Sequence, residues 1–522
     1  MASTTATGVR EGVNPFVIAV VVGLAAFMEV LDISIANVSL RNIAGSLSAG
    51  EDEATWVLTS YLVANAIVLP MSGWFSMLLG RRRFYILSIM LFTGSSLLCG
   101  LAPSLGWLIF FRIVQGLGGG ALQPVSQAIL SDAFPPEKRA MAFSIYGMSV
   151  VAAPAIGPTL GGWITDNFSW HWIFLINVPV GALLVVLSRF FVRDPEALAQ
   201  ARRARFREGL KIDYVGFALI AIGLGALQIV LDKGQQEDWF ESQFIAVLSI
   251  VAAAALVFAC VWEWRHRQPV MNLRLLKDRN FSTGLVLMFM LGLVLLGSTV
   301  LLPLMTQALF GYSPTQAGMV ISPGGLCIMV LMPIVGTLLS HTDPRRLILF
   351  GMGVLAASMF YMTTLDLGTD YRTLMLARIF QAVGMAFLFI PINTVAFLDI
   401  DSAESGNASA LINLARNIGG SVGISILTTL LARGAQQHQA HLVDRFTPFD
   451  APYAAAQQQL TQHLGDAGAA QGLLYGMLQK QSMMLSFLDD FRLLGWVVLL
   501  LLPVILLLRP LRPGEHVAMT PH

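Results

Sequence analysis

The chain has 522 residues, of which 56% are hydrophobic and only 12% are charged, about half the charged fraction of an ordinary soluble domain. A soluble core of this length cannot hide so much apolar surface, so most of that surface must face lipid. The formal net charge of +1 gives no sign of a nucleic-acid partner.

The first apolar run extends from Phe16 to Val38 and contains Asp32. It is longer than the apolar region of a signal peptide, so we expect a retained first helix. A helix needs about 20 apolar residues to cross the hydrocarbon core. Runs of this kind along the chain predict an all-α integral membrane protein with fourteen transmembrane helices. The expected spans are 16–38, 56–79, 84–102, 105–130, 141–164, 172–191, 214–231, 244–264, 281–305, 315–339, 347–365, 373–398, 408–431 and 491–508.

The distribution of Lys and Arg predicts the orientation of these spans. An even number of spans places both termini on the same side of the membrane. With the N-terminus inside, the inner segments hold 22 Lys and Arg, the outer segments hold 7, and three lie within helices. Cytoplasmic loops carry the excess of positive charge, so we expect both termini in the cytoplasm.

Two connections between spans are unusually long. The segment 192–213 contains the run RRARFR and is predicted to be a cytoplasmic basic linker. The segment 432–490 is rich in Gln, Ala and His and is predicted to be a periplasmic loop. Connections of this length are usually either functional or disordered.

An internal repeat relates two parts of the chain. The segment 112–118 (RIVQGLG) is echoed at 378–384 (RIFQAVG), 266 residues later, and the same offset places Gly157 on Gly423. One register therefore covers two consecutive helices, which is typical of transporters built from parallel repeats. We expect an N-terminal six-helix half (1–191), the linker, two extra helices (214–264), a C-terminal six-helix half (281–508) and a cytoplasmic tail (509–522).

Few charged side chains lie within the predicted helices. A charge at the bilayer centre costs roughly 2.5–3.5 kcal/mol on insertion scales, so such groups persist mainly where they are paired or face a cavity. An ion pair that only fixes helix packing is one interpretation, but in a multi-helix protein we favour a functional role. The clearest of these residues are Glu29, Asp32, Arg112, Arg378 and Arg416.

Glu29 and Asp32 lie three residues apart and therefore share one face of the first helix. Counting residues from the helix ends places both acids and Arg112 at a similar depth in the membrane. Two neighbouring acids in a low-dielectric interior cannot both be ionised cheaply, which suits a proton carrier. We therefore predict a proton-coupling site made of Asp32, Glu29 and Arg112, without a choice between the acids.

The fifth predicted helix carries a stripe of small residues and two prolines. Ala153, Gly157 and Gly161 recur at four-residue spacing, which permits close contact with another helix. Pro154 and Pro158 remove backbone donors and predict a kink. A simple packing motif explains the glycines but explains the two prolines less well.

The sequence offers little support for other chemistry. It contains no Walker A motif, so we do not expect an ATP-driven pump. Cys99, Cys260 and Cys327 lie in apolar runs without a CxxC pair, so we expect neither a metal nor a disulfide. His438 and His441 are expected to be solvated. With no catalytic cluster and no motif for a cofactor, we do not expect an enzyme.

Together these residues resemble the major facilitator superfamily, specifically its fourteen-spanner drug:proton antiporters of the EmrB/QacA type. The resemblance covers nearly the whole chain. One departure is the segment 73–83 (GWFSMLLGRRR), which lacks the usual acid and first Arg and puts the family's cytoplasmic gating pair in doubt; Glu29 also lies outside the family motifs. The matching motifs are 31–38 (LDISIANV), 112–116 (RIVQG), 157–162 (GPTLGG), 170–179 (WHWIFLINVP) and 416–423 (RNIGGSVG).

The resemblance implies a secondary active transporter that exports amphipathic toxic compounds in exchange for protons. Length and the long connection 432–490 fit the EmrB branch, which implies a Gram-negative inner membrane, an HlyD-like adaptor of the EmrA type in the periplasm and a TolC-like outer-membrane channel. The residues expected to line or gate the substrate cavity are Asn37, Gln115, Gly116, Pro154, Gly157, Pro158, Gly161, Arg378, Gln381 and Arg416.

Two alternatives to multidrug efflux stay open at this point. One is proton-coupled export of a specific metabolite or fatty acid by the same mechanism. The other is a membrane-embedded enzyme or receptor, which should show a catalytic cluster near a membrane surface.

The predicted orientation can be tested with single cysteines introduced into a chain whose three native cysteines are replaced by serine. A membrane-impermeant maleimide added from outside should label Gln457→Cys but not Gln200→Cys, because the latter lies in the basic linker. The opposite labelling pattern would reverse the orientation.

Overall fold

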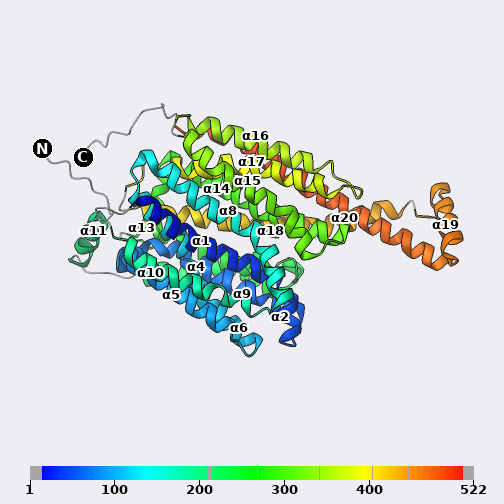
Figure 1. Ribbon diagram of the computed structural model, residues 1–522, viewed down its shortest axis with the longest axis horizontal. Coiled ribbons are helices and arrows are strands. Elements are labelled where there is room, and N and C mark those ends of the chain that lie inside the picture. The colour runs from blue at the N-terminus through cyan, green and yellow to red at the C-terminus, as the bar shows by residue number, and fades with distance from the viewer. Residues whose placement is uncertain are drawn as a thin grey trace.

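The computed structural model describes residues 14–194, 196–207, 213–266, 269–339, 341–401, 404–444, 446–447 and 449–509. Within these ranges every regular element is a helix, and most helices run along the long axis of one bundle (Figure 1). The predicted all-α fold is therefore confirmed. Of the predicted tail, only its first residue is described.

The elements follow one another in an order close to that of the predicted spans. They are α1 (Pro15–Val38), α2 (Leu40–Ser46), α3 (Glu51–Ala54), α4 (Trp56–Leu79), α5 (Arg81–Cys99), α6 (Leu105–Gly119), α7 (Leu122–Ala133), α8 (Pro136–Asn167), α9 (Trp172–Leu175), α10 (Asn177–Phe191), α11 (Glu196–Arg207), α12 (Tyr214–Lys233), η1 (Trp239–Glu241), α13 (Gln243–Arg265), η2 (Leu273–Lys277), α14 (Arg279–Phe310), α15 (Pro314–Leu339), α16 (Pro344–Met362), α17 (Tyr371–Ala396), α18 (Ser405–Val443), α19 (Ala451–Leu464), α20 (Ala467–Leu500) and η3 (Leu502–Leu507).

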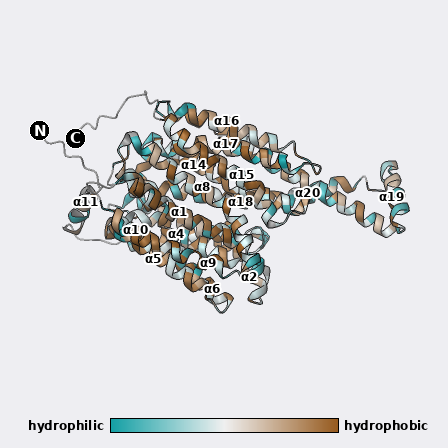
Figure 2. Cartoon of the chain, in the orientation of Figure 1, coloured by the Kyte–Doolittle hydropathy of each residue, from teal (hydrophilic) through white to brown (hydrophobic). Residues whose placement is uncertain are grey.

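Each of the fourteen predicted spans coincides with one of these helices or with consecutive helices. Twelve spans among the described residues are long and apolar enough to cross a membrane, and the bent helix α8 raises the number to thirteen. The remaining predicted span is α5, which begins with three arginines, Arg81–Arg83, and is less apolar on average. It packs against α6 and α10 within the bundle. Figure 2 shows hydrophobic residues over the body of the bundle.

The segment 432–490, which the sequence analysis treated as a connection between spans, is largely helical. Helix α18 continues to Val443, and α19 and the first part of α20 follow after short breaks. The 39 residues of α18 extend over about 58 Å, well beyond a hydrocarbon core of about 30 Å. The far ends of α18 and α20 therefore project from the bundle together with α19 (Figure 1). Ala and Gln, which are frequent in this segment, are good helix formers in water.

Helix α8 is bent by 46° between Lys138–Pro154 and Ile156–Asn167. Pro158 has no N–H to donate to the carbonyl of Pro154, and Pro154 has none for the carbonyl of Val150, so two successive turns each lack a hydrogen bond. The predicted kink is therefore confirmed.

The glycines of α8 allow it to pack closely between α1 and α15. A Cβ atom on Gly157 would lie 2.5 Å from the Cβ of Ser34, and one on Gly161 would lie 3.0 Å from Cγ2 of Ile35. On the other side, a Cβ on Gly318 of α15 would lie 3.0 Å from the backbone nitrogen of Thr159. The bent helix thus joins the first helix of the N-terminal half to the C-terminal half.

The substitution Gly157→Leu should separate α8 from α1, because its side chain would have to occupy the space of Ser34. Overpacking of this kind typically destabilises by about 1–3 kcal/mol. We expect normal membrane insertion, a lower midpoint of thermal unfolding in detergent, and loss of the expected export. The matched control is Gly353→Leu in α16, where a Cβ meets no atom within 4 Å. Equal unfolding midpoints for the two variants would contradict the close packing.

Candidate functional site

A buried ion pair lies at the centre of the N-terminal half. Nη1 of Arg112 on α6 lies 2.6 Å from Oδ2 of Asp32 on α1, and both side chains are 0% exposed. The sequence placed these two residues at a similar depth, and the structure brings them into direct contact.

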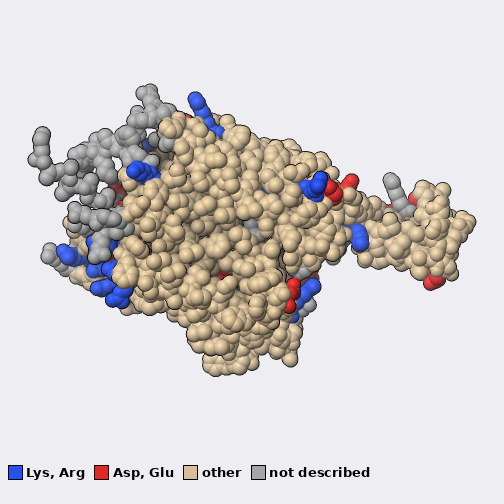
Figure 3. All heavy atoms as spheres, viewed as in Figure 1, with Lys and Arg blue, Asp and Glu red and all other residues tan. Residues whose placement is uncertain are grey.

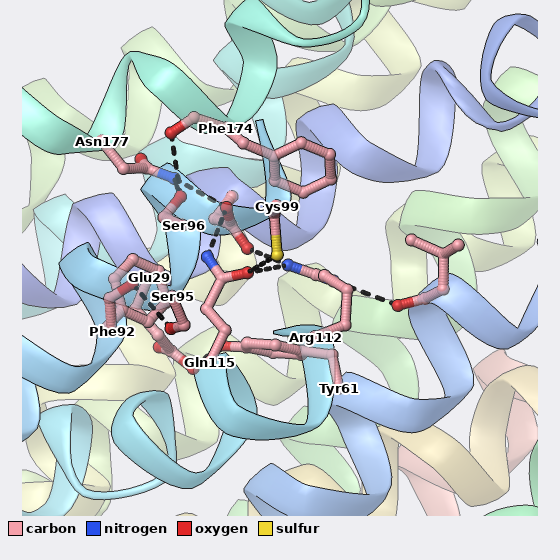
Figure 4. Close-up of polar contacts among 12 residues, drawn as sticks. Glu29, Tyr61, Phe92, Ser95, Ser96, Cys99, Arg112, Gln115, Phe174 and Asn177 are labelled. Atoms are coloured by element: carbon pink, nitrogen blue, oxygen red, sulfur yellow. Dashed lines mark hydrogen bonds and ion pairs between the residues drawn. The ribbon is translucent and has the colours of Figure 1, made fainter. Parts of the chain in front are cut away.

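Two side-chain amides complete the surroundings of the Asp32 carboxylate. Its Oδ1 accepts hydrogen bonds from Nε2 of Gln115 (3.0 Å) and from Nδ2 of Asn177 (2.7 Å). Asn177 opens α10 and also donates to Oγ of Ser96 on α5 (3.1 Å). Figure 4 shows Gln115, Asn177 and Ser96 converging from these separate helices. The carboxylate therefore has one charged donor and two neutral ones.

The guanidinium of Arg112 is held on several sides. Its Nε donates to the carbonyl of Val57 on α4 (3.1 Å), and Nη1 also donates to Oε1 of Gln115 (2.8 Å). The ring of Tyr61 lies 4.2 Å from the guanidinium carbon, close enough for a cation–π attraction. Gly116 permits this approach of α6 to α4, since a Cβ there would lie 2.8 Å from the Cβ of Ala64.

Glu29 is also buried, at 1% exposure, but its partners are neutral. Its carboxylate accepts hydrogen bonds from Nδ2 of Asn65 (3.0 Å), from the Tyr61 hydroxyl (3.3 Å) and from Nε2 of Gln123. None of the ion pairs in the described part of the chain includes Glu29. The two acids of α1 therefore differ in kind, because one is paired with a cation and the other is held by amides and a phenol.

A chain of polar side chains runs from Glu29 to the C-terminal half. The Gln123 amide that donates to Glu29 accepts, through Oε1, a hydrogen bond from Nη2 of Arg416 on α18. Arg416 also donates to Oδ1 of Asn413 (2.8 Å), and Asn413 donates to Oε1 of Gln127 (2.7 Å). Helices α7 and α18 are thus joined by side chains that belong to different halves.

The arrangement around Arg112 has a counterpart in the C-terminal half. Nη1 of Arg378 on α17 donates to Oε1 of Gln381, as Arg112 donates to Gln115. The position that corresponds to Asp32 by the 266-residue offset is Ser298 on α14, and Nε2 of Gln381 donates to its hydroxyl (2.6 Å). The sequence predicted the Arg and Gln of this arrangement but not its serine.

The structure separates some predicted site residues from the acids. Asn37 is exposed near the end of α1. The residues of α8, including Pro154 and Pro158, shape the contact with α1 next to the turn that carries Asp32. The functional residues that the sequence reasoning missed are amides and hydroxyls inside apolar spans, namely Tyr61, Asn65, Ser96, Gln123 and Asn177. Asn177 lies in one of the family motifs, which was the signal available for it.

A second buried ion pair lies at the end of the bundle near α11. Arg81, at the start of α5, pairs with Asp132 of α7 and donates to Oγ of Ser405 in α18 (2.8 Å). Gly73 of α4 approaches α18 closely, because a Cβ on it would lie 2.9 Å from the backbone nitrogen of Asn407. The segment 73–83 departs from the family pattern. A charge pair is nevertheless present here, between Arg81 at the start of α5 and Asp132 of α7.

Comparisons with known proteins agree with this architecture. A model of the Major Facilitator Superfamily matches residues 22–424. The multidrug export protein EmrB of Escherichia coli (strain K12) is 36% identical over 502 residues, which cover 96% of this chain and 96% of that protein. The fatty acid resistance protein FarB of Neisseria gonorrhoeae is 35% identical over 492 residues, which cover 94% and 95%.

Solved structures with a similar fold are more distant in sequence. The proton:xylose symporter XylE has a TM-score of 0.58 at 14% identity, with 94% of each chain covered. The human organic anion transporter MFSD10 has a TM-score of 0.55 at 12% identity, with 93% of this chain and 100% of that chain covered. At these identities the likeness concerns the fold alone.

Proposed function

The chain belongs to the major facilitator superfamily, with relatives among the EmrB multidrug exporters, and we propose that it exports amphipathic toxic compounds in exchange for protons. Membership of this family makes it a secondary transporter and not an enzyme. The observation that carries the proposal is the Asp32–Arg112 pair, 2.6 Å apart and without solvent exposure in the middle of the N-terminal half.

Asp32 is suited to exchange a proton for a substrate. When the carboxylate is ionised, Arg112, Gln115 and Asn177 all donate to it. A proton on Asp32 removes the negative charge that neutralises Arg112, so the pair must be rearranged whenever the acid is loaded. A cationic or polar group of a substrate competes for the same carboxylate. Competition for one site is sufficient for exchange, because each ligand displaces the other.

Glu29 offers a second acid with a different response. Its three donors are neutral, so protonation there leaves no unpaired cation nearby in α6. Through Gln123 it reaches Arg416 of the other half. We therefore assign Glu29 to the link between the halves and to substrate choice, and Asp32 to proton coupling. Rocking of one half against the other would expose both acids alternately to the two sides of the membrane.

We place the protein in the bacterial inner membrane with both termini in the cytoplasm. Figure 3 shows Lys and Arg gathered at the end of the molecule that carries α11, with α19 at the opposite end. The excess of positive charge supports a cytoplasmic position for the α11 end. The projection formed by α18, α19 and α20 would then enter the periplasm, where it offers a surface for an HlyD-like adaptor that leads to a TolC-like outer-membrane channel.

Export of fatty acids is a second candidate function. The fatty acid resistance protein FarB is about as similar to this chain as EmrB is, at 35% against 36% identity. Both activities fit one proton-coupled mechanism.

Asp32→Asn should still bind substrate through the remaining contacts, with lower affinity for a cationic one, but should lose its response to a pH gradient, because an amide cannot carry the proton. In proteoliposomes with an imposed gradient we expect uphill efflux to fall to the level of protein-free vesicles. Arg112→Ala should fail in the same assay, since the acid loses its counter-charge. Glu29→Gln should change the relative rates of different substrates more than the coupling.

The control for these carboxylate variants is Asp166→Asn, which alters an exposed acid on α8 and should behave as the wild type. Uphill efflux at the wild-type rate by the double variant Asp32→Asn, Glu29→Gln would show that these carboxylates only fix helix packing.

Replacing residues 436–480 by a short Gly/Ser linker should impair assembly with the adaptor more than transport by the isolated protein. The deletion removes the projecting ends of α18 and α20 together with α19, but leaves the contact between α18 and α20 in the bundle, where Oγ of Ser486 bonds to the carbonyl of Leu431 (2.8 Å). Adaptor pull-down and drug resistance measure the effect. Phe240→Ser, at the exposed segment η1, is the control. Unchanged pull-down after the deletion would exclude the projection as the docking surface.

A further inference from the structure

The two halves place matching arginines in matching surroundings but give them different counter-charges. Arg112 and Gln115 correspond to Arg378 and Gln381, and the 266-residue offset places Ser298 where the N-terminal half has Asp32. The hydrogen bonds from Arg to Gln and from Gln to the residue of the first helix occur in both halves. Among these matched residues, the difference in charge between the halves is therefore one carboxylate.

In the N-terminal half the charge of Arg112 is neutralised. Asp32 lies 2.6 Å from Nη1, and Nε donates to the carbonyl of Val57. One nitrogen of this guanidinium, Nη2, makes no hydrogen bond within the described residues. Its net charge is nevertheless balanced by the adjacent acid.

In the C-terminal half the charge of Arg378 is not neutralised by any described residue. Its side chain is buried, with 4% of the residue exposed. Its acceptors are Oε1 of Gln381, Oγ of Ser298 (3.5 Å) and Oγ1 of Thr299 (3.3 Å), all of them neutral. No ion pair in the described ranges includes Arg378. A buried cation without a partner is costly, whereas the same cation next to an anion is stabilised.

One N–H of Arg378 is left over as well. Its Nε makes no hydrogen bond within the described ranges, whereas the corresponding atom of Arg112 bonds to a carbonyl. Nε faces Gly324 on α15, where an added Cβ would lie 3.4 Å away and 2.9 Å from Cγ of the arginine. Glycine at this position leaves that side of the guanidinium without a shielding side chain.

We propose that Arg378 is the centre of an anion site, and that Ser298 specifies it by leaving the guanidinium without a counter-charge of its own. The ligand is a small inorganic anion or the carboxylate head of an amphipathic molecule. Gln381, Ser298 and Thr299 orient the guanidinium, and a bound carboxylate or halide completes its charge balance. In the form of a substrate site the inference rests on the proposed export function; as a site for an inorganic anion it does not.

This assignment divides charge recognition between the halves. The acids Asp32 and Glu29 on α1 serve protons and cationic groups, and Arg378 on α17 serves anionic groups. One transporter could then accept amphipathic molecules of either charge, with the anion bound far from the proton-coupling acid along the chain and in the other half of the fold.

Ser298→Asp tests the site while keeping Arg378. The new carboxylate corresponds to Asp32 of the N-terminal half and should form an ion pair with the Arg378 guanidinium, which then cannot bind an external anion. We expect octanoate binding to the purified full chain in uncharged detergent to weaken roughly tenfold or more, as expected when a charge-assisted hydrogen bond is lost. Ser298→Asn, which is close in size but uncharged, is the matched control and should keep octanoate binding near the wild-type level.

The probes are octanoate, octanol and octyltrimethylammonium, each followed by thermal shift and by titration. In a separate experiment, the thermal shift in sodium chloride is compared with that in the sodium salt of a bulky sulfonate at equal ionic strength. Stabilisation by chloride alone identifies an inorganic anion, and stabilisation by octanoate beyond that of chloride identifies a carboxylate; both outcomes support the site. Arg378→Gln should abolish either response. Ser298→Asp also covers the case in which Arg378→Gln does not fold, because its internal ion pair should raise the unfolding midpoint without ligand.

Equal octanoate binding by the wild type and by Ser298→Asp would overturn the site, since binding would then reflect partition of the acyl chain. Export of a cationic dye, measured with the same preparations in proteoliposomes, tests the proposed function independently of the anion site. Dye export with no anion response in the wild type overturns the anion site alone. Anion binding without dye export supports the site and contradicts the proposed function.

Discussion

A charge inside the hydrocarbon layer is costly unless it is paired, and this cost explains the arrangement at the centre of the N-terminal half. Asp32 and Arg112 pair with each other at 2.6 Å. The pair itself joins α1 to α6, and hydrogen bonds with Asn177 and with the carbonyl of Val57 add α10 and α4. Gln115, also on α6, donates to Asp32 as well. Because a single proton on the acid removes the balance of charge, the interaction that stabilises this arrangement is also the one that a proton can release.

Other polar contacts join the two halves. Glu29 reaches Arg416 through Gln123, and Arg81 reaches both Asp132 and Ser405 near the α11 end. The bent helix α8 contacts α1 directly after the turn that carries the acids. At the glycines of α8 the two helices lie so close that no side chain fits between them. A shift of α1 on protonation would therefore displace α8 and, through α15, helices of the C-terminal half.

Much of this could be predicted from sequence because lipid imposes strong rules. Apolar run lengths predict the spans and two prolines predict the bend. Charges within the spans predict that Asp32, Glu29 and Arg112 lie at a similar depth, but not which acid pairs with the arginine. Run lengths say nothing about helices that continue into water, so the helical projection of α18–α20 was missed. Asn37 does not join the cluster around Asp32 because five residues turn a helix by about 140°. Amides such as Gln123 and Asn65 carry no motif, and their roles depend on distances between helices that only the packed structure provides.

The number of protons released when a substrate binds tests most directly whether substrate and proton compete for Asp32. Tetraphenylphosphonium can be added to the purified protein in weakly buffered detergent solution with a pH indicator. Competition for the carboxylate predicts proton release on binding by the wild type and none by Asp32→Asn at equal occupancy. The same release from both proteins would show that the coupling site lies elsewhere and that the Asp32–Arg112 pair is structural.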